Sequence, residues 1–346
     1  MLTFIASVFV FGLLIVFHEL GHFIVAKIVG IKVNEFSLGF GPKILTATGG
    51  ETTYNLRLFP LGGFVNMAGM DPNEETDEKD IERGFNKKTV WQRIAVIFAG
   101  PLMNFFLAAL LFAVIFAYQG QPVPSGGTGI GDVNPGYPAE IAGLAAGDKI
   151  AAVDGIAVDK WNDMAKLINE RPEKDISLLV IRGDSELLLE VKTIRDVDGF
   201  GKIGIYPAEE YVKVGLLQSI SLGVQWTVAF TVVIMEFLSK MIFGQVPAEL
   251  GGPVRIVSEI GVAAQVGFIM LLKLAAILSL NLGLFNLFPI PALDGSRILF
   301  LVWEKIRRRP FDPVKENFIH LVGFAMLILL MLIITYNDIL QIFYVE

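Results

Sequence analysis

Two histidines and a glutamate lie inside an apolar segment of membrane-spanning length near the start of the chain. The sequence His-Glu-Leu-Gly-His occupies residues 18–22, within a largely apolar run over residues 2–29. Residues four apart on a helix share one face, so His18 and His22 can bind one zinc ion while Glu19 acts as general base. Ionisable side chains are costly in hydrocarbon and are usually functional there. The segment therefore predicts metal-dependent hydrolysis inside a membrane.

A catalytic zinc usually takes three protein ligands and leaves one position open. The chain has no cysteine, and its third histidine is His320. We expect Asp294 to be the third ligand, because a lone aspartate in the apolar stretch 282–302 has no ordinary role in a hydrophobic core. Two alternatives stay open at this point. His320 begins the last apolar segment near a polar loop, and Asp294 could hydrogen-bond at a helix kink after Pro289 and Pro291.

The composition is that of a membrane protein. Of the 346 residues, 53% are hydrophobic and 18% are charged, and the mean hydropathy is +0.60. These values lie outside the usual range of soluble domains. The net charge of -7 argues weakly against binding of nucleic acid, and the absence of cysteine excludes disulfides and thiol chemistry. The first apolar segment has no basic flank and no small-residue cleavage site, so we expect a retained span rather than a signal peptide.

Four segments are long and apolar enough to be predicted membrane spans. They are residues 2–29, 91–118, 266–302 and 318–343. A fifth segment, 220–243, is ambiguous because it carries Gln225, Glu236 and Lys240. If the first span runs inward, the basic loop 303–317 lies in the cytoplasm only when 220–243 does not cross, as the positive-inside rule requires. We therefore expect 220–243 to lie on the membrane surface as a helix.

Residues 124–208 have the character of a soluble domain outside the membrane. Turns rich in Gly and Pro separate strand-like runs from an amphipathic helix near 160–170. The stretch Gly-Tyr-Pro-Ala-Glu-Ile-Ala-Gly-Leu-Ala-Ala-Gly-Asp-Lys-Ile at 136–150 is similar to the bacterial PDZ pattern. PDZ domains capture extended peptides by strand addition. We expect a peptide C-terminus as the candidate ligand, with residues 129–131 as a carboxylate-binding loop, or else a domain that serves as a steric filter.

Taken together, the motifs resemble those of site-2 proteases, which are intramembrane zinc metalloproteases, and among them the bacterial RseP-like branch with one PDZ domain. The resemblance covers nearly the whole chain in the expected order. It is carried by the motif at 18–22, Gly-Pro-Leu-Met-Asn at 100–104, Asn-Leu-Phe-Pro-Ile-Pro-Ala-Leu-Asp-Gly at 286–295, and the PDZ insertion between the second and third spans.

The resemblance implies a polytopic α-helical membrane protein with four transmembrane helices, a membrane re-entrant β-sheet and an inserted α+β PDZ domain. The expected parts are an N-terminal membrane core at 1–120 with the re-entrant β segment at about 31–70, the PDZ domain at 124–208, membrane-surface helices at 215–262 and a C-terminal membrane core at 263–346.

The resemblance also implies one zinc ion per chain, held by His18, His22 and Asp294. Glu19 would take a proton from water and later deliver it to the leaving amine. The implied substrate-binding residues are Asn286, Pro289, Pro291, Gly62, Gly63 and Asn104. For Asn286 and Asn104, hydrogen bonding between helices is the alternative. The re-entrant sheet would present an edge to a substrate unwound into an extended strand.

The expected function is endoproteolysis of transmembrane segments of single-span membrane proteins, near the cytoplasmic face of the bacterial cytoplasmic (inner) membrane. The lipid bilayer is thus an expected partner, and the substrate class includes anti-sigma factors or remnant signal peptides. One alternative is a catalytically inactive membrane scaffold with a PDZ domain, although a scaffold needs no base between the histidines. Another is an ion-relay transporter, which would predict repeated halves, and the sequence shows no internal repeat.

Overall fold

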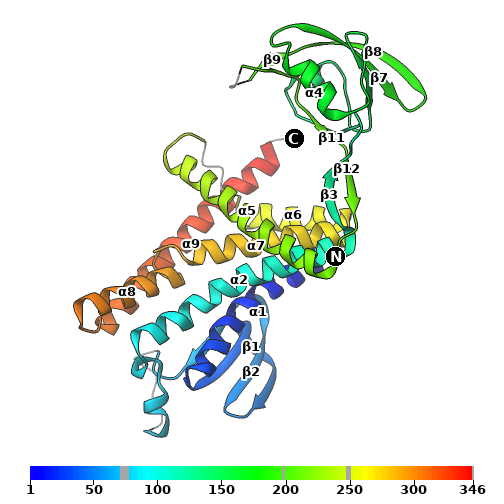
Figure 1. The fold of residues 1–346 in the computed structure, drawn as a ribbon. Helices are drawn as coiled ribbons and strands as arrows, with labels where there is room; N and C mark the ends of the chain where they lie inside the picture. The colour runs from blue at the N-terminus through cyan, green and yellow to red at the C-terminus, as the bar shows by residue number, and fades with distance from the viewer. Residues whose placement is uncertain (71–77, 197–198, 247–250, 345–346) are drawn as a thin grey trace. The chain divides into compact units, whose positions relative to one another are not determined.

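The computed structural model describes residues 1–70, 78–196, 199–246 and 251–344, which form two compact units (Figure 1). The first unit joins Met1–Tyr118 to Gly215–Glu346, and the second is Gln119–Val214. The second unit is thus an insertion into the first, and its bounds lie close to the expected 124–208.

Among the described residues of the first unit, five helices are long and apolar enough to cross a membrane. They are α1 (Leu2–Ile28), α2 (Val90–Gln119), α5 (Leu216–Ile242), α7 (Phe268–Asn286) and α9 (Pro313–Tyr344). The described chain also forms α6 (Pro253–Val266), α8 (Asp294–Arg307) and the short 3-10 helices η1 (Glu78–Arg83) and η2 (Phe85–Lys87). The expected count of four is not confirmed, because α5 satisfies the same criteria of length and composition.

The expected single span over 266–302 is wrong, because the chain breaks between α7 and α8. Pro289 and Pro291 lack a backbone N–H and disfavour helical backbone in the residues before them. Ala292 then takes a left-handed conformation with φ of 79°. The result is a short irregular loop over residues 287–293 that places Asn286 at the end of one helix and Asp294 at the start of the next.

Contacts between side chains give the directions of the central helices. His22 contacts Val96 and His18 contacts Asn104, so α1 and α2 run antiparallel. The Ser279 hydroxyl of α7 donates a 2.8 Å hydrogen bond to the carbonyl of Asn104. Helix α7 therefore packs against α2 beside the segment that contacts His18.

The segment from α5 to α6 leaves one end of this bundle and returns to it. Phe230 of α5 stacks on Phe112 in the C-terminal half of α2, with ring centroids 5.6 Å apart. In α6, Gly261 packs against Thr3, near the start of α1. Helix α7 then begins at Phe268, whose ring lies 6.2 Å from Phe9. Because α2 is antiparallel to α1, residues 215–267 begin and end at the same end of the bundle.

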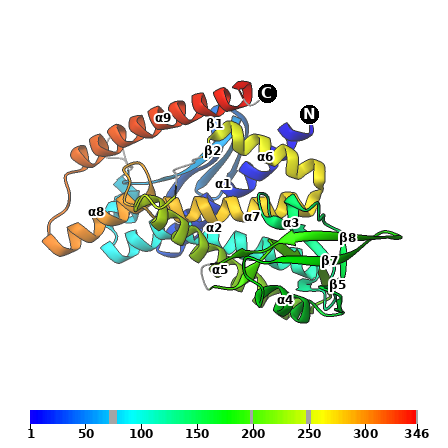
Figure 2. The same cartoon turned by 90° about the horizontal axis from the view of Figure 1, so that it is seen from above.

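Strands β1 (Val33–Gly49) and β2 (Thr52–Met67) form a bent antiparallel sheet beside α1 (Figure 1, Figure 2). Residues 35–38 have partners on both sides, at 63–66 and at 53–56. Within the described pairing, 63–67 has a partner on one side only and is an edge. Buried Phe36, Val65 and Met67 pack with residues of α1 and α2. The strand-rich expectation for 31–70 agrees with this sheet.

The described part of the second unit is a small β-rich fold with two helices and its own core. Its elements are β3 (Gln121–Pro124), β4 (Ile130–Val133), α3 (Pro138–Ile141), β5 (Lys149–Val153), β6 (Ile156–Ala157), α4 (Trp161–Asn169), β7 (Asp175–Arg182), β8 (Ser185–Lys192), β9 (Ile194–Arg195), β10 (Gly201–Lys202), β11 (Ile205–Pro207) and β12 (Glu209–Val212). The main sheet has the order β6-β5-β7-β8, and three further pairs are β11 with β4, β10 with β9, and β12 with β3.

In the core of this unit, every second side chain of a strand points inward. Ile176, Leu178 and Val180 of β7 point inward and are fully buried, together with Ile150 and Met164. At one edge of the core, the buried carboxylate of Asp148 accepts a 2.7 Å hydrogen bond from Nε of Arg182. The hydrogen bond from Arg182 lowers the pKa of Asp148 below its usual value.

Candidate metal centre

Three predicted ligands meet at one point of the first unit. Oδ2 of Asp294 lies 3.2 Å from Nε2 of His18 and 3.5 Å from Nε2 of His22, and the two Nε2 atoms are 3.2 Å apart. Ligand atoms about 2.0–2.1 Å from a tetrahedral zinc are separated by roughly 3.3 Å. The triangle therefore has the size that a zinc site requires. Oδ2 of Asp294 is buried and has no hydrogen-bond partner, which leaves this carboxylate oxygen available to a metal ion.

Hydrogen bonds at the far side of each imidazole direct its Nε2 toward this point. Nδ1 of His22 lies 2.8 Å from the carbonyl oxygen of Val96, so Nδ1 carries the proton and Nε2 is free to bind a metal. Nδ1 of His18 lies 3.1 Å from Nδ2 of Asn104, and Oδ1 of the same amide is buried without a partner. Exchanging the amide oxygen and nitrogen lets Oδ1 accept from the N–H at Nδ1, which pairs both groups and leaves Nε2 of His18 facing the metal point.

Asn104 was expected to bind substrate, and this expectation needs correction. The residue is fully buried and does not line the cavity at the metal centre. Its burial follows from the close approach of the two helices, since a Cβ on Gly21 would meet the backbone of Ala99, and one on Gly100 would meet the imidazoles of His22 and His18. At this depth Asn104 contacts His18, one of the expected metal ligands.

A cavity of about 360 Å³ opens beside the three ligands. Glu19 lines it together with Asn286 and Gly63, so the expected base, the end of α7 and the sheet edge share one space. A Cβ on Gly63 would lie 3.1 Å from Cγ of Glu19, which shows how closely the edge strand approaches α1. The lining also includes residues that sequence reasoning missed, namely Phe64, Val65, Met67, Met70, Ile97, Ala292 and Arg297.

Three other expected substrate-binding residues do not line this cavity among the described residues. Gly62, with φ of 98°, packs against the ring of Phe40. Pro289 is exposed, and Pro291 packs against Gly323 of α9. The positive φ and the fixed proline geometry give these residues the role of shaping the turn and the loop. Substrate binding by Gly62, Pro289 and Pro291 stays a prediction.

His320, the alternative third ligand, lies outside the cluster of ligands. Its Nδ1 accepts a 3.0 Å hydrogen bond from the backbone N–H of Ala292, two residues before Asp294. Nothing in the sequence pattern of the last apolar segment predicts this contact, because it depends on the fold of the loop between α7 and α8.

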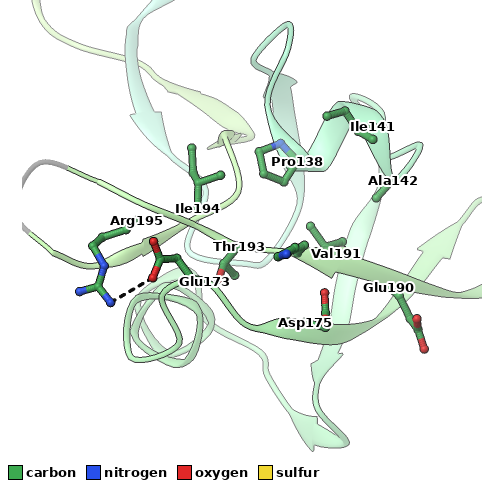
Figure 3. Close-up of a pocket in the computed structure, with 11 residues that line it drawn as sticks. Pro138, Ile141, Ala142, Glu173, Asp175, Glu190, Val191, Thr193, Ile194 and Arg195 are labelled. Carbon is green, nitrogen blue, oxygen red and sulfur yellow. Dashed lines mark hydrogen bonds and ion pairs between the residues drawn. The ribbon is translucent and has the colours of Figure 1, made fainter.

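The second unit carries a separate cavity of about 900 Å³. Figure 3 shows Pro138, Ile141 and Ala142 on one side of it and Val191 and Thr193 on the other. Glu173 and Arg195 form an ion pair of 3.3 Å at its margin. The predicted carboxylate-binding loop at 129–131 does not line this cavity. Its backbone is used in pairing instead, because Ile130 N–H donates to Asp148 and the carbonyl of Gly129 accepts from Ala208. Binding of a carboxylate by residues 129–131 stays a prediction.

Comparison with known proteins adds a family match over most of the chain. Peptidase family M50 matches residues 6–330. The chain is 36% identical to the zinc metalloprotease RasP of Bacillus licheniformis, with 99% of each chain covered, and 35% identical to the regulator of sigma-W protease RasP of Bacillus subtilis, again with 99% of each covered. It is 32% identical to the probable protease eep of Enterococcus faecalis, with 99% of this chain and 100% of that one covered.

Among solved structures, the PDZ domain of the SdrC-like protein from Listeria monocytogenes is 25% identical, with a TM-score of 0.22. The match covers 25% of this chain and 90% of that chain.

Proposed function

This chain belongs to peptidase family M50 and is an intramembrane zinc metalloprotease, and from that premise we propose which residues perform the hydrolysis. His18, His22 and Asp294 hold one zinc ion, and Glu19 is the general base. The observation that carries this assignment is the triangle of ligand atoms, 3.2–3.5 Å on each side, with Glu19 lining the same cavity.

The zinc, when bound, supplies Lewis-acid polarisation of the scissile carbonyl and lowers the pKa of water. Glu19 accepts a proton from the attacking water and delivers it to the nitrogen of the leaving amine as the peptide bond breaks, so that Glu19 ends the reaction unprotonated, as it began. His22 and His18 keep their metal-facing nitrogens unprotonated through their contacts with Val96 and Asn104. Asn286 lies in the same cavity and donates to the carbonyl oxygen of the scissile bond.

The edge strand at 63–67 binds the substrate as an added strand. Its backbone has a described partner on one side only, and Gly63, Val65 and Met67 line the cavity of the metal centre. A helical substrate shields its own amides, whereas an extended strand offers them to a sheet edge and exposes the scissile bond. Recognition through backbone groups fits a protease whose substrates are transmembrane segments of varied sequence.

The two ends of the segment 215–267 support the orientation that we propose for the protein. Because this segment leaves and re-enters one end of the bundle, it does not change the side on which α7 begins, whether or not α5 spans the bilayer. The loop after α8 then lies on the side opposite the N-terminus of α1. The last turn of α8 and the residues that follow it carry Lys305, Arg307, Arg308 and Arg309, and the positive-inside rule favours the cytoplasmic side for such a basic segment. The PDZ-like unit, inserted between α2 and α5, is extracytoplasmic, and the membrane is the bacterial cytoplasmic membrane.

The substrates we propose are single-span membrane proteins, such as anti-sigma factors or remnant signal peptides, in line with the name of the Bacillus subtilis relative. The PDZ-like unit acts as a size filter that excludes substrates with large external domains. Its ends are paired, with Gln121 opposite Val212, so residues 121–212 can be replaced by a short turn. Such a deletion should keep the zinc and allow cleavage of substrates with bulky external domains. Loss of cleavage of trimmed substrates by the folded deletion variant would instead make the unit a docking site.

The metal assignment is tested on the full chain in lipid nanodiscs with a single-span substrate. The wild-type protein should contain about one zinc per chain and cleave within the transmembrane segment. His22→Phe should lose both zinc and cleavage. Phe9→Leu, on the same helix and away from the cluster, is the matched control and should keep both. Full zinc occupancy in His22→Phe would reject the ligand set.

A further inference from the structure

The loop that delivers Asp294 to the metal centre has little regular structure of its own. Residues 287–293 connect two helices, and Ala292 holds a left-handed φ of 79°, which residues other than Gly, Asn and Asp rarely adopt. Asp294 follows two residues later as the first residue of α8. A loop with such backbone strain keeps its shape only when its surroundings hold it.

Helix α9 supplies that support from one face. Nδ1 of His320 accepts a 3.0 Å hydrogen bond from the N–H of the strained residue, Ala292. Nε2 of the same ring faces Glu316 at 3.8 Å, so the proton belongs on Nε2 and Nδ1 is the acceptor. One turn further along the same face, Gly323 packs against Pro291, and a Cβ there would lie 2.8 Å from the carbonyl oxygen of Pro291.

Elsewhere α9 is attached sparsely to the rest of its unit. In its most apolar 18-residue stretch only 6% is buried, which is the lowest share among the five long apolar helices. Its other polar attachment among the described residues is Asp338, which accepts hydrogen bonds from the N–H groups of Gly252 and Arg255 at the start of α6. His320 also meets the ring of Phe300 on α8 edge-on, with centroids 5.7 Å apart. The end of α9 nearest the metal centre is therefore fixed by the loop and by α8.

We propose that His320 is a positioning residue that holds the 287–293 loop, and thereby Asp294, in the geometry that binds zinc. The inference rests on the proposed zinc site. The histidine touches neither metal nor substrate, and it acts through the Ala292 hydrogen bond, with Gly323 giving α9 room to approach Pro291.

The matched pair His320→Leu and His320→Asn tests the hydrogen bond, because the two side chains have nearly the same shape and only Asn offers an acceptor near the place of Nδ1. Each full-length variant is loaded with zinc in nanodiscs and challenged with a chromogenic chelator. Partners that orient metal ligands typically change metal affinity by 10–100-fold, so His320→Leu should lose zinc at least about tenfold faster than wild type. His320→Asn should lose zinc close to the wild-type rate. The absorption spectrum of the cobalt-substituted protein should change in His320→Leu and not in His320→Asn.

Gly323→Ala is the second probe, and it is needed if His320→Leu fails to fold. It should also accelerate zinc loss, because its methyl group pushes the loop at Pro291. Val322→Ala on the same helix is its control. Wild-type zinc loss in both folded His320→Leu and Gly323→Ala would overturn the proposal, as would equal damage in His320→Asn and His320→Leu. A wild-type protein that binds no zinc would instead reject the proposed metal site itself.

Discussion

Adding one methyl group at Gly21 should damage the metal centre without touching a ligand. Gly21 lies between Glu19 and His22 of α1, where α1 packs against α2. A Cβ there would meet the carbonyl oxygen of Ala99, would lie 2.6 Å from its carbonyl carbon, and would lie 3.0 Å from Cα of Gly100. Backbone atoms cannot rotate out of the way as the end of a flexible side chain can. The two helices must therefore separate.

The size of that separation sets the expected effect. Ordinary contact begins near 3.4 Å, so α1 and α2 must move apart by about 1 Å at this point. The hydrogen bond between His22 and Val96 is 2.8 Å long and would break at that displacement. Overpacking costs about 1–3 kcal/mol, and a misplacement of about 1 Å at a catalytic site can cost about 100-fold in rate. We expect Gly21→Ala to cleave a single-span substrate about 100-fold more slowly.

The control is Gly12→Ala on the same helix, where a Cβ would meet nothing within 4 Å. Both substitutions raise helix propensity by up to about 1 kcal/mol, so any difference between them reflects packing. Cleavage in nanodiscs and zinc retention against a chelator are measured side by side for the two variants. If Gly21→Ala matched Gly12→Ala in both, the close approach of the helices would not be what sets the ligand geometry.

Three further predictions concern chemistry, pH and topology. Glu19→Gln should keep zinc and lose peptide hydrolysis by several orders of magnitude, because the amide cannot accept a proton; normal turnover would require a different base. Since the Arg182 hydrogen bond lowers the pKa of Asp148, its stabilising effect should be complete above the ordinary carboxyl pKa of about 3.9 and be lost as pH falls below it. The Arg182→Met variant of the 119–214 unit should thus have a lower melting temperature than wild type at neutral pH, and this difference should vanish in acid. A difference that persists at the lowest pH would show that the Arg182 hydrogen bond does not act through the ionised Asp148. Because the chain has no cysteine, a single cysteine can be introduced by Leu188→Cys or by Arg308→Cys and treated with a thiol reagent that does not cross the membrane. When the reagent is added from outside, only Leu188→Cys should react.

The sequence predicted the parts of the site that depend on local spacing. Two histidines four apart on a helix share a face whatever surrounds them. An aspartate in an apolar stretch indicates a functional role, because placing a carboxylate in hydrocarbon costs free energy. These features directed attention to His18, His22 and Asp294, which the structure brings together. The sequence also predicts the β-rich character of residues 31–70, because Gly and Pro separate short strand-like runs there.

The features that the sequence did not reveal depend on how distant elements meet. The depth of Asn104 is set by the approach of α1 to α2 at Gly21 and Gly100, which only the packed helices reveal. The break at 287–293 was underestimated, because apolar composition continues across it while Pro289 and Pro291 end the helix. The contact between His320 and Ala292 joins two segments through a loop geometry that no periodicity describes.

The pairing of β3 with β12 has a consequence for how this protein could have arisen and changed. Four consecutive residue pairs, from Gln121 opposite Val212 to Pro124 opposite Glu209, close the inserted unit at its two ends. An insert whose ends lie side by side can enter or leave a gene in a single event, since the flanking helices need no new spacing. The membrane core and the inserted unit can therefore diverge at separate rates.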